Sequence, residues 1–138
     1  MLDCEYIESI KQECQKHQEI LAAYIFGSRA RGQAGAGSDL DLAVLLYEQA
    51  GQDFDYLELK VALERLLDQE VDLIVLNNSE EPLKHQVRRD GRIIFDRDPE
   101  KRKHWEIMSR KFYQDFLHLH RIYMQGMRRA LGVSADGQ

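Results

Sequence analysis

Two aspartates, Asp39 and Asp41, stand two residues apart where an apolar run, Leu40–Leu46, begins. In a β-strand, residues i and i+2 point to the same face, so both carboxylates would project together while Leu40 and Leu42 project into a core. Two carboxylates about 4 Å apart repel by about 1 kcal/mol in water and by about 4 kcal/mol near a protein surface. A divalent cation would replace this repulsion by coordination, and Mg²⁺ takes one or two carboxylates together with substrate phosphates.

A turn of small residues precedes the acid pair and offers groups that suit phosphate. Gly27 and Ser28 follow a first apolar run, Ile20–Phe26. Gly27 has no side chain, so a ligand can approach the backbone closely. Ser28 is a good helix N-cap, and a helix N-terminus presents free N–H groups and the positive end of the helix dipole. Phosphate oxygens could therefore lie on Gly27 and Ser28 while a metal joins them to the acids, and Ser38 is placed to hydrogen-bond beside these acids.

A third acid, Asp72, interrupts the apolar run Glu70–Leu76. An acid within such a run needs a partner, a cation or contact with water, because burying an isolated charge is costly. The residues alone leave two alternatives open, a position beside a cation and a position on an edge strand that is open to water.

The acids and the turn together form a longer pattern, in which Gly27-Ser28 is followed by ten residues and then by Asp39-Leu40-Asp41. Taken alone, a D-x-D pair is usually a solvated strand face and a G-S pair is usually a turn. In this order, after an apolar strand, they resemble the G-S-x10-D-x-D signature of the DNA polymerase beta-like nucleotidyltransferase superfamily. The segments GSRARG and SDLDLAVLL are similar to those of its smallest branch, the minimal nucleotidyltransferases (MNT). The resemblance covers about the first two-thirds of the chain.

The resemblance implies roles for six residues. In that superfamily a third carboxylate arrives from a neighbouring strand shortly after the D-x-D pair, and the VDLIVL setting places Asp72 opposite Asp39 and Asp41. These three acids would be the catalytic residues and the ligands of two Mg²⁺ ions, with ATP as the substrate. The residues expected to bind the nucleotide are Gly27, Ser28 and Ser38.

The apolar periodicity and the resemblance predict an α/β (α+β) fold, with a small mixed β-sheet of about four strands flanked by helices. This is the nucleotidyltransferase fold, here followed by a long C-terminal helix. We expect a single domain over residues 1–138, with a catalytic core at about 18–97 and the C-terminal helix at about 98–131. The other predicted elements are strands at 20–26, 40–46, 70–76 and 92–96, a short helix and loop at 27–38, and helices at 3–17, 54–68 (capped by Asp53) and 82–89.

Large apolar residues recur at spacings of three and four along the predicted C-terminal helix. They are Trp105, Met108, Phe112, Phe116, Leu119, Tyr123 and Met127. Such a stripe is more often a packing surface than a cofactor site. The sequence leaves open whether the stripe packs on its own sheet or on another chain.

Composition narrows the classes of partner. The formal net charge of -5 argues against a general nucleic-acid binder, which carries a basic face, so no direct contact with nucleic acid is expected. No apolar run approaches the length of a membrane span, and the first residues lack a signal-peptide pattern. The two cysteines, Cys4 and Cys14, indicate reduced thiols, and we expect a cytoplasmic protein.

The predicted function is metal-dependent transfer of a nucleotide to a hydroxyl. The resemblance implies transfer of AMP from ATP to a tyrosine of a HEPN-domain ribonuclease toxin, which would make the chain an antitoxin in a hetero-oligomer with that toxin. Two alternatives stay open. The chain could neutralise its partner without chemistry, by binding and masking it with the long C-terminal helix, or it could modify a small molecule such as an aminoglycoside.

Overall fold

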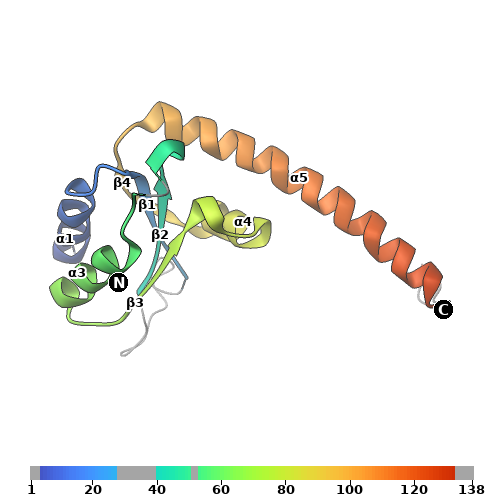
Figure 1. Ribbon diagram of the computed structural model, residues 1–138, viewed down its shortest axis with the longest axis horizontal. Helices are drawn as coiled ribbons and strands as arrows, with labels where there is room; N and C mark the ends of the chain where they lie inside the picture. Colours follow the sequence, from blue (N-terminus) through green and yellow to red (C-terminus); the bar gives the residue numbers. More distant parts are fainter. Residues whose placement is uncertain (1–3, 28–39, 51–52, 133–138) are drawn as a thin grey trace.

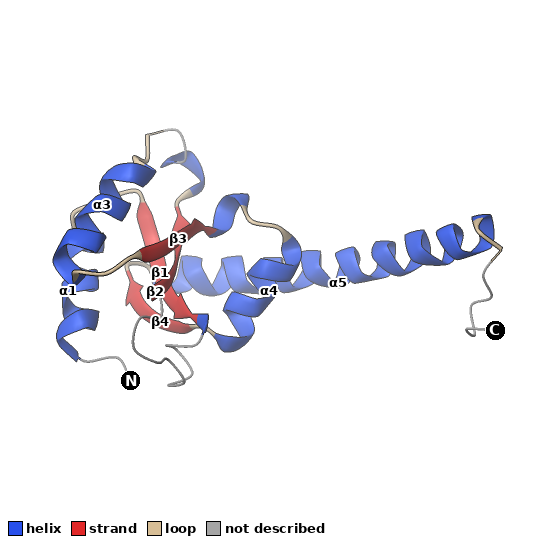
Figure 2. Ribbon diagram, turned by 90° about the horizontal axis from the view of Figure 1, so that it is seen from below, coloured by secondary structure: helices blue, strands red, loops and turns tan. Residues whose placement is uncertain are grey.

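The computed structural model describes residues 4–27, 40–50 and 53–132 of the chain. The strands are β1 (Ile20–Phe26), β2 (Leu40–Leu46), β3 (Val71–Val75) and β4 (Arg92–Asp96), and they form one mixed sheet in the order β3-β2-β1-β4. The helices in these ranges are α1 (Cys4–Gln15), α3 (Tyr56–Leu67), α4 (Glu81–Asp90) and α5 (Pro99–Ala130), with short 3-10 turns at η1 (Glu48–Ala50) and η2 (Leu76–Asn78). α1 and α3 cover one face of the sheet, and α4 and the start of α5 cover the other (Figures 1 and 2). The predicted fold class is confirmed.

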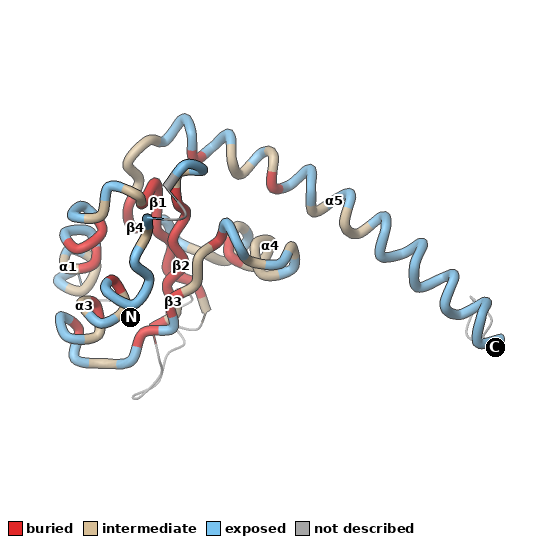
Figure 3. Tube along the Cα trace, viewed as in Figure 1, coloured by how far each residue is buried: buried red, intermediate tan, exposed pale blue. Residues whose placement is uncertain are grey.

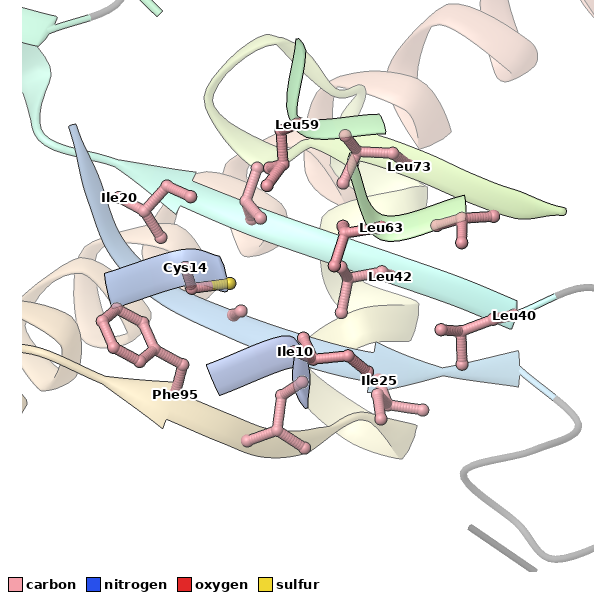
Figure 4. Close-up of a cluster of buried hydrophobic side chains, with 14 of the residues drawn as sticks. Ile10, Cys14, Ile20, Ile25, Leu40, Leu42, Leu59, Leu63, Leu73 and Phe95 are labelled. Atoms are coloured by element: carbon pink, nitrogen blue, oxygen red, sulfur yellow. The ribbon is translucent and has the colours of Figure 1, made fainter. Parts of the chain in front are cut away.

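The central strand β2 is buried on both faces because its side chains alternate between two clusters. Leu40, Leu42 and Val44 pack in a cluster with residues of α1 and α3, as Figure 4 shows for the first two. Ala43 and Leu45 pack in a second cluster with residues of α4 and α5. Strands covered on both faces appear in the sequence as continuous apolar runs, which is how β1 and β2 were predicted. In β2 only Asp41 is not fully buried.

The strand directions bring three strand ends together. β2 runs antiparallel to β1 and parallel to β3, and β4 runs antiparallel to β1. Phe26, the last residue of β1, is the register partner of Asp41, and Asp41 is in turn the register partner of Asp72. The end of β1 and the starts of β2 and β3 therefore lie at the same end of the sheet.

Helix α3 begins two residues later than predicted, and its cap differs. Asp55 is the N-cap, and its side chain accepts a hydrogen bond from the backbone N of Glu58 at 3.1 Å. Phe54, just before the cap, is partly buried against the cluster that contains Leu59 in the first turns of the helix, the positions of a hydrophobic staple. The prediction of Asp53 as the cap is wrong, because burial of Phe54 sets where the chain enters the helix.

The side chain of Arg97, which follows β4, forms hydrogen bonds both to the end of α1 and to the first residue of β1. Its guanidinium donates from Nε to the carbonyl of Ile20 at 2.9 Å, and from Nη2 to the carbonyls of Cys14 and His17 at 3.2 Å each. The last carbonyls of a helix lack intrahelical donors, and the last turn of α1 contains no basic residue. Arg97, which is distant in the sequence, therefore supplies hydrogen-bond donors and a positive charge at the C-terminal end of α1.

Replacing Arg97 by Gln is expected to lower the free energy of unfolding by about 2–3 kcal/mol, since several hydrogen bonds from a charged donor are lost together. Urea unfolding followed by circular dichroism measures the change. Arg65→Gln, on the exposed side of α3, is the control and should stay within about 0.5 kcal/mol of the parent chain. Equal stability of the Arg97 variant would mean that water satisfies these carbonyls equally well.

The first turns of α5 are anchored by a partly buried polar network. The helix begins as predicted, with Asp98 as N-cap. The Arg102 side chain, in a residue only 8% exposed, donates to Asp96 of β4 at 2.8 Å and to Glu106 at 2.7 Å. Tyr24 of β1 donates its hydroxyl to Glu106 at 3.4 Å. Burial above all, and then the charge of Glu106, raise the pKa of Tyr24, so the phenol stays protonated as a donor.

Beyond these turns α5 extends away from the sheet, as Figures 1 and 3 show. The predicted apolar stripe accordingly divides in two. Trp105 packs against the second cluster, whereas Leu119, Tyr123 and Met127 are exposed. Of the helices within the described ranges, none combines the length and hydropathy needed to cross a membrane.

Candidate active site

Two of the three predicted acids are neighbours across β2 and β3. Asp41 and Asp72 are register partners, and hydrogen-bonded strands lie about 4.8 Å apart. The flanking residues Leu40, Leu42 and Leu73 all lie in the cluster beneath α1 and α3. Because side chains alternate along a strand, both acids point to the opposite face of the sheet. The structure thus brings Asp72 beside Asp41.

The two acids differ in their contact with solvent. Asp72 is exposed, because β3 is an edge strand of the sheet, and Asp41 is half-buried. The alternative of an edge position open to water therefore describes Asp72 correctly. It does not compete with a role beside a cation, since the exposed carboxylate also has a second acid next to it. Like charges at directly adjacent positions of a sheet are destabilising.

Gly27 lies directly beside the acid pair. Its backbone φ is +77°, in the left-handed region that favours glycine. A Cβ placed on Gly27 would overlap with Oδ2 of Asp41. The Asp41 carboxylate therefore occupies the space that a side chain at position 27 would need. The sequence alone suggested a different reason for this glycine, namely access of a ligand to the backbone.

The remaining predicted site residues, Ser28, Ser38 and Asp39, lie outside the described residues, as does the predicted helix and loop at 28–38. Within the described ranges no group of three or more potential metal ligands gathers. The two acids within the described ranges still suit a hard cation such as Mg²⁺, which takes carboxylate oxygens and retains several waters. Asp41 and Asp72 offer adjacent carboxylates, and the exposure of Asp72 leaves room for water.

Two side chains without a sequence signal hold the edge strand β3 in place. The hydroxyl of Tyr56 donates to the carbonyl of Leu73 at 2.6 Å. Asn77 uses both ends of its amide on the backbone of Leu46: Nδ2 donates to its carbonyl at 2.9 Å and Oδ1 accepts from its N–H at 2.8 Å. Asn77 thus continues the hydrogen bonding between β2 and β3 past the end of β3. These two residues help to fix the strand that presents Asp72.

Comparison with known proteins gives the class. Residues 8–100 match the family model described as Polymerase beta, Nucleotidyltransferase. This stretch contains all four strands and both described acids. The chain therefore belongs to the polymerase beta nucleotidyltransferase family, as the resemblance predicted.

Individual relatives indicate to which branch of this family the chain is most similar. Protein adenylyltransferase MntA of Thermococcus cleftensis is 33% identical over 94 residues, which span 65% of this chain and 94% of MntA. A solved toxin–antitoxin structure with AMP-PNP contains a chain with a TM-score of 0.66 and 24% identity, covering 94% of this chain and 95% of that one. The complex of a tri-AMPylated Shewanella oneidensis HEPN toxin with an MNT antitoxin matches with a TM-score of 0.64, 22% identity and the same coverage. This chain is thus an MntA-like minimal nucleotidyltransferase, and its similarity of fold extends through the long C-terminal helix.

Proposed function

We propose that the chain is an antitoxin that transfers AMP from ATP to a tyrosine hydroxyl of a cognate HEPN ribonuclease toxin. The observation that carries the proposal is the pair of register neighbours Asp41 and Asp72, at the end of the sheet where Gly27 closes β1. The proposed transfer needs carboxylates that can hold cations, and this end of the sheet offers two adjacent ones. The name of MntA indicates transfer of AMP to a protein, and the tri-AMPylated HEPN toxin in a related complex supports such a toxin as the acceptor.

Each predicted residue has a role in this reaction. Asp41 and Asp72, together with Asp39, would hold two Mg²⁺ ions, and Gly27, Ser28 and Ser38 would hold the phosphates of ATP. Bound there, Mg²⁺ neutralises phosphate charge and lowers the pKa of the acceptor hydroxyl, which is ordinarily about 10 for tyrosine.

The transfer itself exchanges one bond for another. The tyrosine oxygen forms a bond to the α-phosphorus of ATP while the bond from that phosphorus to the β-phosphate oxygen breaks. Pyrophosphate leaves, and the hydroxyl proton passes to water or to Asp72, whose exposed carboxylate is open to an incoming acceptor.

The direct test is a mass measurement. We expect that incubation of the chain with ATP, MgCl₂ and the cognate HEPN toxin raises the mass of the toxin by one or more AMP units and abolishes its ribonuclease activity. Omission of MgCl₂ with added EDTA should prevent the change, because the acids then lack their cations. An unchanged toxin mass under complete conditions would overturn the proposal.

The masking alternative has its own supporting observation, the exposed half of α5, which could cover a partner. A variant with Asp39→Asn and Asp41→Asn separates the two functions. If chemistry neutralises the toxin, the variant should bind the toxin and fail to protect cells. If masking is sufficient, protection should survive in cells that carry this variant.

We also propose the cytoplasm as the site of action. ATP is supplied there, and the reducing conditions keep thiols such as those of Cys4 and Cys14 free. Burial, chiefly, raises the pKa of the Cys14 thiol to about 12, which leaves it inert as a nucleophile.

A further inference from the structure

Helix α4 crosses the face of the sheet to which Asp41 and Asp72 point. The end of the sheet where β2 and β3 begin is called the acid end below. α4 follows β3 and η2 at the opposite end, and it leads into β4, whose first residue, Arg92, is the register partner of Ile25 near the acid end. The helix therefore runs diagonally from the β3 edge to the β4 edge. One flank faces the corner that contains Asp72, and the other faces the corner where β4 ends and α5 begins; Figure 1 shows α4 between α5 and the starts of β2 and β3.

The contacts of α4 show which of its residues lie on each flank. Val87 is buried in the second cluster and Leu83 packs against it, so these two residues mark the side that faces the sheet. Lys84 lines a groove together with residues from the start of α5, so it lies on the flank next to α5. Successive residues are about 100° apart around a helix axis, which places Lys84 about 80° from the sheet-facing side in one direction and Gln86 about 80° from it in the other. Gln86 therefore lies on the flank that faces the acids.

Gln86 is half-buried, and its side-chain amide forms no hydrogen bond with another described residue. A glutamine amide carries both donors and an acceptor. The amide of Asn77, by contrast, has both of its ends bonded to the backbone of Leu46. Gln86 thus offers a donor and an acceptor to a molecule that lies between α4 and the acids.

Two half-buried apolar side chains lie over the same face of the sheet as the acids. Ile74 follows Asp72 by two residues in β3, so both side chains point to this face at positions about 7 Å apart. Leu83 lies on the sheet-facing side of α4, three residues before Gln86. Both Ile74 and Leu83 pack against the second cluster and remain partly exposed. An apolar surface with an amide at its border therefore adjoins the acid pair.

A nucleobase fits this surface better than the acceptor side chain does. A base is a flat ring with apolar faces and polar edges, and the ribose joins it to the α-phosphate beside the acids. A glutamine amide can form two hydrogen bonds with adenine at once, because it donates to a ring nitrogen and accepts from the 6-amino group. The acceptor tyrosine has one polar group, its hydroxyl, and the transfer requires that hydroxyl at the α-phosphorus. A tyrosine on this surface would therefore leave Gln86 without a partner.

We infer that Gln86 hydrogen-bonds the edge of the adenine of ATP while the base packs against Ile74 and Leu83. Gln86 contacts no reacting atom, so it determines the affinity for the nucleotide and the choice of base rather than the rate of the chemical step. The inference rests on the proposed function, because the nucleotide is taken to be the ATP that supplies AMP, with its phosphates beside Asp41 and Asp72.

The first experiment measures binding of ATP with MgCl₂ to the full chain by calorimetry, without the toxin. Gln86→Ala should weaken binding by about tenfold, as expected for the loss of two hydrogen bonds. Gln86→Glu keeps the shape of the side chain but cannot donate, so it should weaken binding at least as much. Alanine is the best helix former, so α4 should persist in the first variant. Gln12→Ala, at an exposed position of α1, is the matched control and should bind ATP as the wild-type chain does.

A second nucleotide tests the contact with the base itself. Purine riboside 5′-triphosphate lacks the 6-amino group of ATP and is otherwise the same molecule. The wild-type chain should bind it about fivefold more weakly than ATP, because one hydrogen bond is lost. Gln86→Ala should bind the two nucleotides nearly equally, since the partner of the 6-amino group is then absent. An unchanged preference for ATP in Gln86→Ala would overturn the inference.

The inference and the proposed function fail in different ways. If Gln86→Ala weakens ATP binding as expected but the wild-type chain leaves the toxin mass unchanged, the proposed transfer is wrong and the base contact stands. If the wild-type chain modifies the toxin and Gln86→Ala binds ATP equally well, the base contact is wrong and the proposed transfer stands. Weaker binding of the toxin by Gln86→Ala, with ATP binding kept, would assign this flank of α4 to the acceptor and would also overturn the inference.

Discussion

Replacing Asp72 by Asn is expected to lower the rate of AMP transfer by about 10³-fold or more, equivalent to about 4 kcal/mol of transition-state stabilisation. Asparagine preserves the size of the side chain and loses the charge that a cation needs and the basicity that could accept the hydroxyl proton. Binding of AMP-PNP should be largely kept, because the proposed phosphate ligands, Gly27, Ser28 and Ser38, lie between β1 and β2 in the sequence and not on β3. Single-turnover transfer to the toxin, with nucleotide binding measured by calorimetry, checks both parts.

The Asp72→Asn variant also has a readout that does not depend on catalysis. Because Asp72 is exposed and beside a like charge, removing its charge should leave the metal-free stability unchanged or slightly higher. Mg²⁺ should raise the Tm of the wild-type chain, since a ligand stabilises the state that binds it, and should raise that of the variant less. Asp53→Asn, at another exposed position, is the matched control. Transfer at the wild-type rate by Asp72→Asn would remove Asp72 from the mechanism.

The face of the sheet on which Asp41 lies could be predicted from the sequence because a strand has a simple period. Alternation in β2 sends Leu40 and Leu42 to one cluster and leaves Asp41 on the other face, which a reader of the sequence can work out. The pairing of Asp72 with Asp41, in contrast, could not be predicted from the alternation of side chains along a strand. Register between two strands depends on the whole sheet, so only the resemblance to a known family suggested it.

Other features depend on contacts between distant residues and had no local signal. Asp53 and Asp55 are equally good caps by residue type, and burial of Phe54 in the core decides between them. Arg97 completes a helix that ends about 80 residues earlier in the chain. The apolar stripe of α5 has one spacing throughout, so periodicity could not tell its packed beginning at Trp105 from its exposed end at Tyr123.

Gly27→Ala is expected to lower both the stability of the chain and the rate of AMP transfer. The left-handed φ of +77° costs an alanine about 1–2 kcal/mol, and the new Cβ overlaps with the Asp41 carboxylate, so the variant should lose about 2 kcal/mol or more of stability. Displacement of Asp41 by even about 1 Å should lower transfer by about 10²-fold. Thermal unfolding and the toxin mass assay measure the two effects.

Two comparisons separate the overlap with Asp41 from a general intolerance of alanine. Gly126→Ala, in α5 where a Cβ meets nothing within 4 Å, should instead stabilise the chain by about 1 kcal/mol. In an Asp41→Ala background, Gly27→Ala should cost only the backbone strain, so the two substitutions should be less than additive in stability. Strict additivity would show that Gly27 and the Asp41 carboxylate do not share this space, and the proposed arrangement of the site would then be wrong at the position where the phosphates are expected.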